Sequence, residues 1–248
     1  MTFKLLSYNI RFGGAGREHL IARVIRAAAP ELVVFQEATN PEVIEQIAEE
    51  TEFPLWAAKR GHSIAFLSRM AVAHYEWHYS LGARHPFMEI ELTPQTRVFG
   101  LHLSARFSKW SEMRRVREIR QLLADIQKYQ YGFHALVGDF NTLAPGEILN
   151  VKRMPTWIRA LIWLSGRDIQ RHTIQTMLDA NYVDGFRHLH PVGDGTTFPT
   201  WDPHLRLDYV FIPKGFAPRL RQMHVLKDIP NVTGASDHFP LLAEIECE

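Results

Sequence analysis

Short apolar segments that end in a polar residue recur along this chain, and this pattern constrains its fold more than any other feature. Segment 3–10 carries Asn9 near its end, and segment 32–35 is followed closely by Glu37. Between these segments, apolar residues recur at helical spacing over 19–29. A strand, a helix and a second strand in this order predict two parallel strands that lie side by side in one sheet.

The rest of the chain continues to alternate strands and helices. Asn40 and Pro41 are residue types favoured at a helix start, so a helix is expected from there to Glu50. Further strands are expected over 63–67, 71–77, 87–92, 97–103, 134–137, 207–212 and 239–245, with helices over 111–127, 173–180 and from Thr156. The short links between 63 and 103 favour antiparallel pairing there. The whole pattern predicts one α/β domain over residues 1–248, built on two packed sheets.

The composition excludes several classes of protein. Lys and Arg number 28 against 27 Asp and Glu, which gives a net charge of +1, and 46% of the residues are hydrophobic. These values exclude bulk disorder and argue against a protein that coats nucleic acid through overall charge. Cys247 is the only cysteine, so no disulfide forms within the chain. Because no signal peptide or long apolar run is present, a cytoplasmic protein is expected.

The polar residues at or just after the ends of the expected strands carry the chemistry. They are Asn9, Glu37, His102, Asp139, Asn141, Asp208, Asp237 and His238. Strand ends gather along one rim of an α/β sandwich, so these side chains are expected to share a cleft. Carboxylates brought together in this way repel one another unless a cation intervenes, and oxygen ligands suit Mg²⁺ or Mn²⁺. The pattern favours metal-assisted attack of water on a phosphate ester.

The order and spacing of seven segments add a resemblance to this interpretation. The segments are Ser-Tyr-Asn-Ile-Arg at 7–11, Gln-Glu at 36–37, Ile-Ala-Phe-Leu-Ser-Arg at 64–69, Gly-Leu-His-Leu at 100–103, Gly-Asp-Phe-Asn at 138–141, Arg-Leu-Asp-Tyr-Val-Phe at 206–211 and Ser-Asp-His-Phe-Pro at 236–240. In this order they resemble the endonuclease/exonuclease/phosphatase superfamily, whose members share the fold of deoxyribonuclease I and exonuclease III. The resemblance implies a four-layered α/β sandwich of two packed mixed β-sheets flanked by helices.

The resemblance also assigns roles to the residues of the cleft. It implies that Glu37, with Asn9 beside it and Asp237 as a second carboxylate, binds the divalent ion. Asp139 then positions or deprotonates the attacking water, and Asn141 holds that water or a phosphate oxygen. Whether one or two ions act, and which residue is the general base, is left open by the sequence.

Two histidines complete the implied catalytic set. The resemblance has His238 donate to a phosphate oxygen while Asp208 orients it and keeps it cationic. His102 occupies the place of a residue that contacts the phosphate or assists the leaving group. The other histidines match no motif and are expected to serve packing or solvation.

The substrate class is less constrained than the reaction. The superfamily hydrolyses DNA, RNA, phospholipids and inositol phosphates, and a nucleic-acid phosphodiesterase or nuclease is favoured here. Arg11 stands where the abasic-site endonucleases of the superfamily have Asp, which disfavours a dedicated abasic-site enzyme. A phospholipid or inositol-phosphate hydrolase is the alternative. A non-catalytic binding protein of the same fold is disfavoured, because every implied cleft position is filled.

Several basic and aromatic residues are candidate substrate contacts. They are Arg11, Arg106, Lys109, Trp201 and Arg206. Arg106 and Lys109 follow the strand of His102, so they are expected near the cleft, with aromatic residues beside them for base stacking. The arginines from 114 to 120 are expected to form the solvated face of a helix instead.

A basic segment rich in tryptophan stands apart from the motifs. Segment 151–171 holds five Lys or Arg residues against one Asp, with Trp157 and Trp163 among them. We interpret it as an insertion into the domain. Packing against the sandwich is the favoured role. The alternatives are a substrate lid, a dimer contact and contact with a lipid surface, and the composition suggests the last of these.

Overall fold

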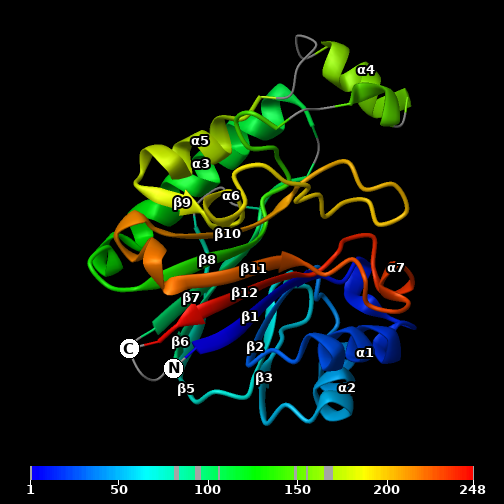
Figure 1. Ribbon diagram of the computed structural model, residues 1–248, viewed down its shortest axis with the longest axis vertical. Coiled ribbons are helices and arrows are strands. Elements are labelled where there is room, and N and C mark those ends of the chain that lie inside the picture. The colour runs from blue at the N-terminus through cyan, green and yellow to red at the C-terminus, as the bar shows by residue number, and fades with distance from the viewer. Residues whose placement is uncertain are drawn as a thin grey trace.

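Two six-stranded β-sheets lie face to face in the structure, and helices cover the outer face of each (Figure 1). The computed structural model describes residues 2–80, 84–92, 96–105, 107–147, 150–154, 156–164 and 170–247. The four layers, helix, sheet, sheet and helix, confirm the predicted α/β sandwich.

The first sheet combines strands from both ends of the chain. Its spatial order is β11 (Leu220–Val225), β12 (Leu241–Glu246), β1 (Thr2–Asn9), β2 (Leu32–Gln36), β4 (Ala65–Ser68) and β3 (Leu55–Ala57). β1 and β2 run parallel, and the other neighbouring strands run antiparallel. Helix α1 (Glu18–Ala28) connects β1 to β2, so the predicted strand–helix–strand unit is confirmed.

The second sheet is formed by the middle of the chain. Its spatial order is β5 (Val72–His78), β6 (Phe87–Leu92), β7 (Thr96–His102), β8 (His134–Asp139), β10 (Asp208–Pro213) and β9 (Tyr182–Asp184). The parallel pair here is β7 with β8, which α3 (Lys109–Asp125) connects, and the other pairs are antiparallel. Each sheet therefore has one parallel pair near its centre, and both pairs end at the same edge of the sandwich.

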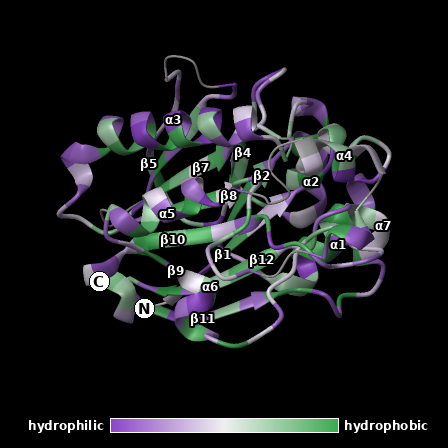
Figure 2. Cartoon of the chain, turned by 90° about the horizontal axis from the view of Figure 1, so that it is seen from above, coloured by the Kyte–Doolittle hydropathy of each residue, from purple (hydrophilic) through white to green (hydrophobic). Residues whose placement is uncertain are grey.

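The remaining helices are arranged around these sheets. α2 (Pro41–Thr51) and α7 (Val232–Ala235) lie with α1 on the first sheet, and α5 (His172–Asp179) lies beside α3 on the second. α6 (Gly185–Leu189) contacts β10 and β11. Short 3₁₀ segments occupy Gln127–Tyr129, Val151–Arg153 and Lys214–Arg219. Colouring by hydropathy shows the strands as the most hydrophobic part of the chain and α3 with hydrophilic residues along its length (Figure 2).

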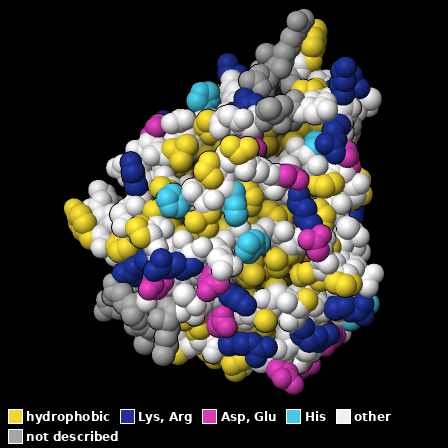
Figure 3. All heavy atoms as spheres, viewed as in Figure 1, with side chains coloured by type: hydrophobic (Ala, Val, Ile, Leu, Met, Phe, Trp, Pro, Cys, Tyr) yellow, Lys and Arg dark blue, Asp and Glu magenta, His cyan; other side chains and the backbone are white. Residues whose placement is uncertain are grey.

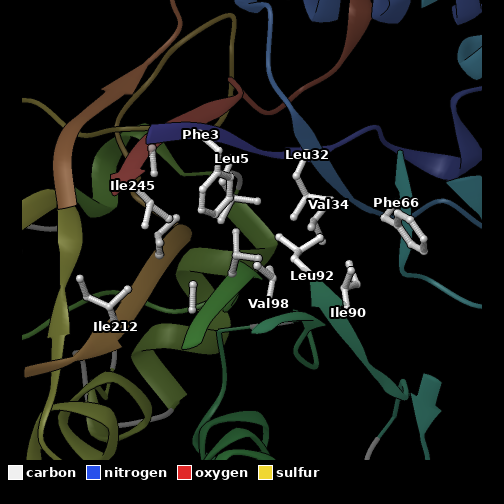
Figure 4. Packing of buried hydrophobic residues seen from close by; sticks show 14 of the residues in the cluster. Phe3, Leu5, Leu32, Val34, Phe66, Ile90, Leu92, Val98, Ile212 and Ile245 are labelled. Atoms are coloured by element: carbon white, nitrogen blue, oxygen red, sulfur yellow. The ribbon is translucent and has the colours of Figure 1, made fainter. Parts of the chain in front are cut away.

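The main core lies between the two sheets. Leu5 and Val34 of the first sheet meet Ile90 and Val98 of the second in one buried cluster (Figure 4). Gly100 of β7 keeps this layer thin, because a Cβ atom there would lie 2.7 Å from Cγ1 of Val34. One strand of each parallel pair, β2 and β8, is buried along its whole length, which agrees with its largely apolar sequence.

The structure also corrects the expected strands. Segments 63–67 and 71–77 were expected as successive neighbours, but β4 and β5 belong to different sheets. The strand expected over 134–137 continues through Asp139. β3, β9 and β11 were not predicted, because two of them have only three residues and β11 carries exposed polar residues.

Helix α3 differs from its expected solvated basic face. Arg115 is 1% exposed, and its guanidinium donates to Glu112 at 2.8 Å and to the carbonyl of Ser104 at 2.8 Å. Glu112 also accepts from the backbone and the hydroxyl of Thr173 on α5, at 2.7 and 3.0 Å. The expectation that Arg115 is solvated was therefore wrong, since it belongs to a buried network between α3 and α5.

The tryptophan-rich segment 151–171 forms a helix at the rim of the molecule. Residues 155 and 165–169 lie outside the described part of it. α4 (Thr156–Leu164) projects from the sandwich at the upper right of Figure 1, with Trp157 and Trp163 exposed at 60% and 61%. Hydrophobic and basic side chains gather at the same place in Figure 3. Among the described residues, no helix has both the length and the apolar character that a membrane span requires.

Candidate active site

Polar residues from both sheets meet at one edge of the sandwich. In the second sheet, Asp139 at the end of β8 is opposite His102 of β7 on one side and Asp208 of β10 on the other. In the first sheet, Asn9 ends β1 and Glu37 follows β2. The amide of Asn9 links the sheets, because Nδ2 donates to Glu37 Oε1 at 3.3 Å and to Asp139 Oδ2 at 3.1 Å.

The backbone around Asp139 explains the glycine and asparagine on either side of it. At Gly138 φ is 147°, and a Cβ atom would lie 1.9 Å from the carbonyl oxygen of Leu101. Asn141 has a φ of 52°, and its backbone N–H donates to Asp139 Oδ1 at 2.8 Å. Its side-chain Nδ2 donates to the carbonyl of Leu103 at 3.0 Å. Gly138 therefore allows the close approach of β8 to Leu101, and Asn141 fixes the orientation of the Asp139 carboxylate.

A buried ion pair joins His238 to Asp208. His238 Nδ1 donates to Asp208 Oδ2 at 2.8 Å, and both side chains are almost fully buried. Burial by itself would lower the pKa of His238, but the carboxylate of Asp208, helped by Asp139 and Asp237, raises it well above its usual range. The imidazole is therefore cationic at neutral pH, with its Nε2 facing Asp139 Oδ2 at 3.9 Å.

Asp139 lies among groups of both charges. Burial raises its pKa, and the nearby carboxylates of Asp208 and Glu37 add to this effect. The charge of His238 and the backbone N–H of Asn141 act in the opposite direction. The carboxyl group of Asp139 is therefore a stronger proton acceptor than an exposed aspartate.

His102 is neutral and held by a serine. Burial lowers its pKa to about 3, and the positive charges of His85, His238 and Arg84 contribute to this shift. Ser63 Oγ accepts from the backbone N–H of Glu37 at 3.0 Å and lies 2.6 Å from His102 Nδ1. We assign the hydroxyl proton to this second contact, which leaves the ring proton of His102 on Nε2. Nε2 lies 3.8 Å from Asp139 Oδ2.

Glu37 stands at a sharp turn after β2. Its φ is 59°, and its backbone N–H is the donor to Ser63 described above. Its Oε2 accepts from the backbone N–H of Phe12 at 2.7 Å, while Oε1 faces Asn9. Asn9 and Phe12, at and just after the end of β1, therefore hold the carboxylate of Glu37 at one side of the site entrance.

Asp237 forms the other side of this entrance. Its Oδ2 lies 3.4 Å from Nε of Arg11, whose side chain is half-exposed. Its carbonyl accepts from the backbone N–H of Thr200 at 2.9 Å, and the adjacent Trp201 is 66% exposed. Arg11 and Trp201 thus lie at the cleft, where the sequence predicted substrate contacts.

Arg206 does not reach the cleft, contrary to its expected contact with substrate. Its side chain is 1% exposed, and Nη2 lies 2.7 Å from Asp184 Oδ2 and 2.8 Å from Glu147 Oε1. Arg187 binds the same oxygen of Glu147 at 2.8 Å. This buried network fixes the loop that leads into β10 and hence to Asp208.

The two other expected basic contacts have different outcomes. Lys109 is exposed at the first residue of α3, which begins shortly after β7 ends. Arg106 lies outside the described residues. Lys109 therefore remains a candidate substrate contact.

Sequence patterns missed several residues that shape the site. Ser63 positions His102, and the ring of His85 stacks on that of His102 with centroids 5.0 Å apart and planes 3° apart. Phe198 contacts His238 with ring centroids 4.7 Å apart. These residues lie outside the polar strand ends that marked the other site residues. Of these residues, Ser63 alone lies directly beside a segment that carries the family resemblance, the one at 64–69.

Comparison with solved structures supports the fold. The 3' phosphatase NExo from Neisseria, bound to product DNA hairpin, superposes with a TM-score of 0.76 at 16% identity, covering 99% of this chain and 100% of that one. An AP endonuclease from Archaeoglobus fulgidus has a TM-score of 0.76 at 15% identity, with coverages of 99% and 100%. A humanized D. rerio TDP2 has a TM-score of 0.71 at 14% identity, and each chain is covered to 99%.

The family follows from the sequence match. No curated protein matches this chain. The model of the Endonuclease/Exonuclease/phosphatase family, however, matches residues 6–238, from the end of β1 to His238. Its range contains all eight predicted cleft residues at the strand edge described above. The chain therefore belongs to the Endonuclease/Exonuclease/phosphatase family and is a phosphoester hydrolase.

Proposed function

We propose that this chain is a nucleic-acid phosphodiesterase or nuclease that uses Mg²⁺ or Mn²⁺ and hydrolyses its substrate by in-line attack of water. The observation that carries the proposal is the cationic His238, bonded to Asp208 and facing Asp139 from the same strand edge. This arrangement supplies a fixed positive charge for the phosphate beside a carboxylate that can accept a proton, and both favour phosphate hydrolysis.

Two imidazole N–H groups face one carboxylate oxygen. Nε2 of His102 and Nε2 of His238 lie 3.8 and 3.9 Å from Asp139 Oδ2, which is too long for a hydrogen bond. Both groups are therefore available to donate to a phosphate that binds beside the carboxylate. His238 brings a full charge to a non-bridging oxygen, and neutral His102 brings a hydrogen bond.

Asp139 is the proposed proton acceptor for the attacking water. Its raised pKa suits the task. A carboxyl group whose pKa lies near neutral is still partly ionised at neutral pH, and it binds a proton more strongly than an ordinary carboxylate does. Asn9 and Asn141 hold its two oxygens, so the carboxylate has a fixed direction. Asn141 acts in this proposal through the orientation of Asp139.

The donor groups at the entrance fit a hard divalent cation. Glu37, Asn9 and Asp237 offer carboxylate and amide oxygens, the ligands that Mg²⁺ and Mn²⁺ prefer. Asp139, Asp208 and His238 also have ligand atoms within 4.8 Å of one another. That cluster fits a cation poorly, because His238 is protonated and its Nδ1 is bonded to Asp208. A bound ion supplies Lewis acidity to the phosphate and lowers the pKa of water.

Nucleic acid is the substrate class that the surroundings favour. Arg11 and Trp201 place a cation and an exposed aromatic ring beside Asp237, which suits a phosphate backbone and its bases, and Lys109 is a further exposed cation at the start of α3. Two of the similar structures are a 3' phosphatase bound to a DNA hairpin and an AP endonuclease, which supports the same class.

An activity panel tests the proposal. The purified chain is assayed with Mg²⁺ and with Mn²⁺ on duplex, single-stranded and abasic DNA, RNA, sphingomyelin and phosphoinositides. We expect cleavage of at least one nucleic acid, and a loss of about 100-fold or more in kcat for Asp139→Asn and His238→Gln. Tyr131→Ala is the matched control. Tyr131 is 89% exposed and precedes the start of β8, whereas Asp139 lies at the other end of that strand. Cleavage of lipids alone, or full activity of both variants, contradicts the proposal.

A further inference from the structure

The turn after β1 has an unusual backbone. Arg11, Phe12, Gly13 and Gly14 follow one another with φ values of 51°, 48°, 77° and 74°. Glycine adopts such angles freely, whereas side chains on Arg and Phe crowd the backbone there. Backbone strain of this kind is concentrated at functional sites.

The strained turn holds Phe12 against the proposed metal ligand. The backbone N–H of Phe12 donates to Glu37 Oε2 at 2.7 Å, and that of Gly13 donates to the carbonyl of Glu37 at 2.8 Å. Arg11 meets Asp237 on the other side of the entrance. The position of the Phe12 backbone is thus tied to both sides of the cleft entrance.

The ring of Phe12 contributes nothing visible to the core. It is 79% exposed and belongs to none of the buried apolar clusters among the described residues. The guanidinium carbon of Arg11 lies 5.5 Å from its centroid. Glycine would satisfy this backbone better than phenylalanine, so the fold does not account for an aromatic ring at this position.

We propose that Phe12 is a substrate-contacting residue that stacks on the base of a nucleotide beside the scissile phosphate. This inference rests on the proposed function, because it names the subsite of that same active site. An exposed aromatic face next to a guanidinium suits a nucleobase and its phosphate. Trp201 follows Thr200, whose backbone N–H binds the carbonyl of Asp237, so a second exposed ring borders the same entrance.

Three substitutions separate a stacking role from a structural one. Phe12→Gly removes the ring and suits the positive φ, so its Tm should equal or exceed that of the parent chain. Phe12→Trp keeps an aromatic face. Tyr131→Ala is the matched control, since it removes an equally exposed ring outside the cleft.

The substrates are oligonucleotides with Mg²⁺ or Mn²⁺, each carrying one abasic tetrahydrofuran nucleotide at a different position around the cleavage site. We expect Phe12→Gly to lower kcat/KM on the intact oligonucleotide about tenfold, a loss typical of one base-stacking contact. At one position, the abasic nucleotide should lower kcat/KM of the parent chain by the same factor of about ten. The same abasic nucleotide should leave kcat/KM of the Phe12→Gly variant unchanged. Phe12→Trp should restore the parent's preference.

Two results overturn the inference in different ways. In the first, the parent cleaves nucleic acid, but Phe12→Gly either has the same kcat/KM as the parent or falls below it by the same factor on every abasic substrate. Phe12 then does not stack on a base, and the proposed function stands. If the parent cleaves no nucleic acid under any of these conditions, the proposed function and the inference fail together.

Discussion

The hydroxyl of Ser63 determines which nitrogen of His102 carries the ring proton. Ser63 Oγ accepts from Glu37 N–H and is 2.6 Å from His102 Nδ1, so it connects the proposed metal ligand to the neutral imidazole. Without that hydroxyl, Nδ1 of a buried ring loses its partner and the proton is free to move between the nitrogens. The site depends on this contact even though Ser63 touches no substrate in the proposal.

We therefore expect Ser63→Ala to lower kcat about fivefold and to change KM little, because one hydrogen bond is worth about 1 kcal/mol and acts on the orientation of His102. Steady-state kinetics on the cleaved substrate measures this. Ser68→Ala is the matched control, since Ser68 is a buried serine whose hydroxyl donates to the carbonyl of Met70 at 2.8 Å. Equal kcat values for the two variants would show that Ser63 has no role in orientation.

Residue types and their order predicted most of the site but not the direction of every side chain. Asp139 and Asp208 lie opposite each other, as expected for residues at the ends of neighbouring strands. Arg206 was expected to contact substrate. Its partners, Asp184 and Glu147, are 22 and 59 residues away in sequence. No local pattern identifies such partners, so the burial of Arg206 could not be predicted.

Helix α3 illustrates the same limit for a complete element. Its apolar spacing predicted a helix with a charged outer face, and the helix is present. The pattern does not show that the neighbouring helix α5 covers part of that face. Glu112 accepts hydrogen bonds from Arg115, Thr142 and Thr173, so the carboxylate connects α3, α5 and the residue after Asn141.

Removing this carboxylate should destabilise the fold strongly. We expect Glu112→Ala to lower the free energy of unfolding by about 3–5 kcal/mol, because it removes the carboxylate that pairs with the buried charge of Arg115. Urea unfolding followed by circular dichroism measures this value. Glu45→Ala, at an exposed position of α2, should change it by less than about 0.5 kcal/mol. A loss at Glu112 as small as at Glu45 would contradict the role of the network.

The strands were predictable to the extent that they are long and buried. β1, β2, β7 and β8 are mostly buried and were all expected, and Asn9, His102 and Asp139 lie at the ends of three of them. β3 and β9 have three residues each, which is too few for a periodic pattern to appear. The change of sheet between β4 and β5 depends on contacts across the whole sandwich and has no local signal.

The nearly neutral chain conceals an uneven distribution of charge. Lys and Arg exceed Asp and Glu by one, yet Glu37, Asp139, Asp208 and Asp237 all lie at one edge of the sandwich. His238 compensates for part of this negative charge. The remaining carboxylates repel one another, so the fold carries an electrostatic cost at its active edge in the absence of a cation.

A divalent ion should therefore stabilise the whole fold, and this can be measured without any substrate. At a concentration 100 times its Kd, a ligand that binds only the folded chain adds about 2.7 kcal/mol, which for a chain of this size raises Tm by about 5–10 °C. We expect Mg²⁺ or Mn²⁺ to produce such a shift in a thermal unfolding scan and EDTA to reverse it. Glu37→Gln should abolish the shift while leaving the metal-free Tm equal or higher, because it removes one of the repelling charges. Glu45→Gln is the matched control and should keep the full shift. If Glu37→Gln also keeps it, the ion binds elsewhere, and the assignment of Glu37 as a metal ligand is wrong.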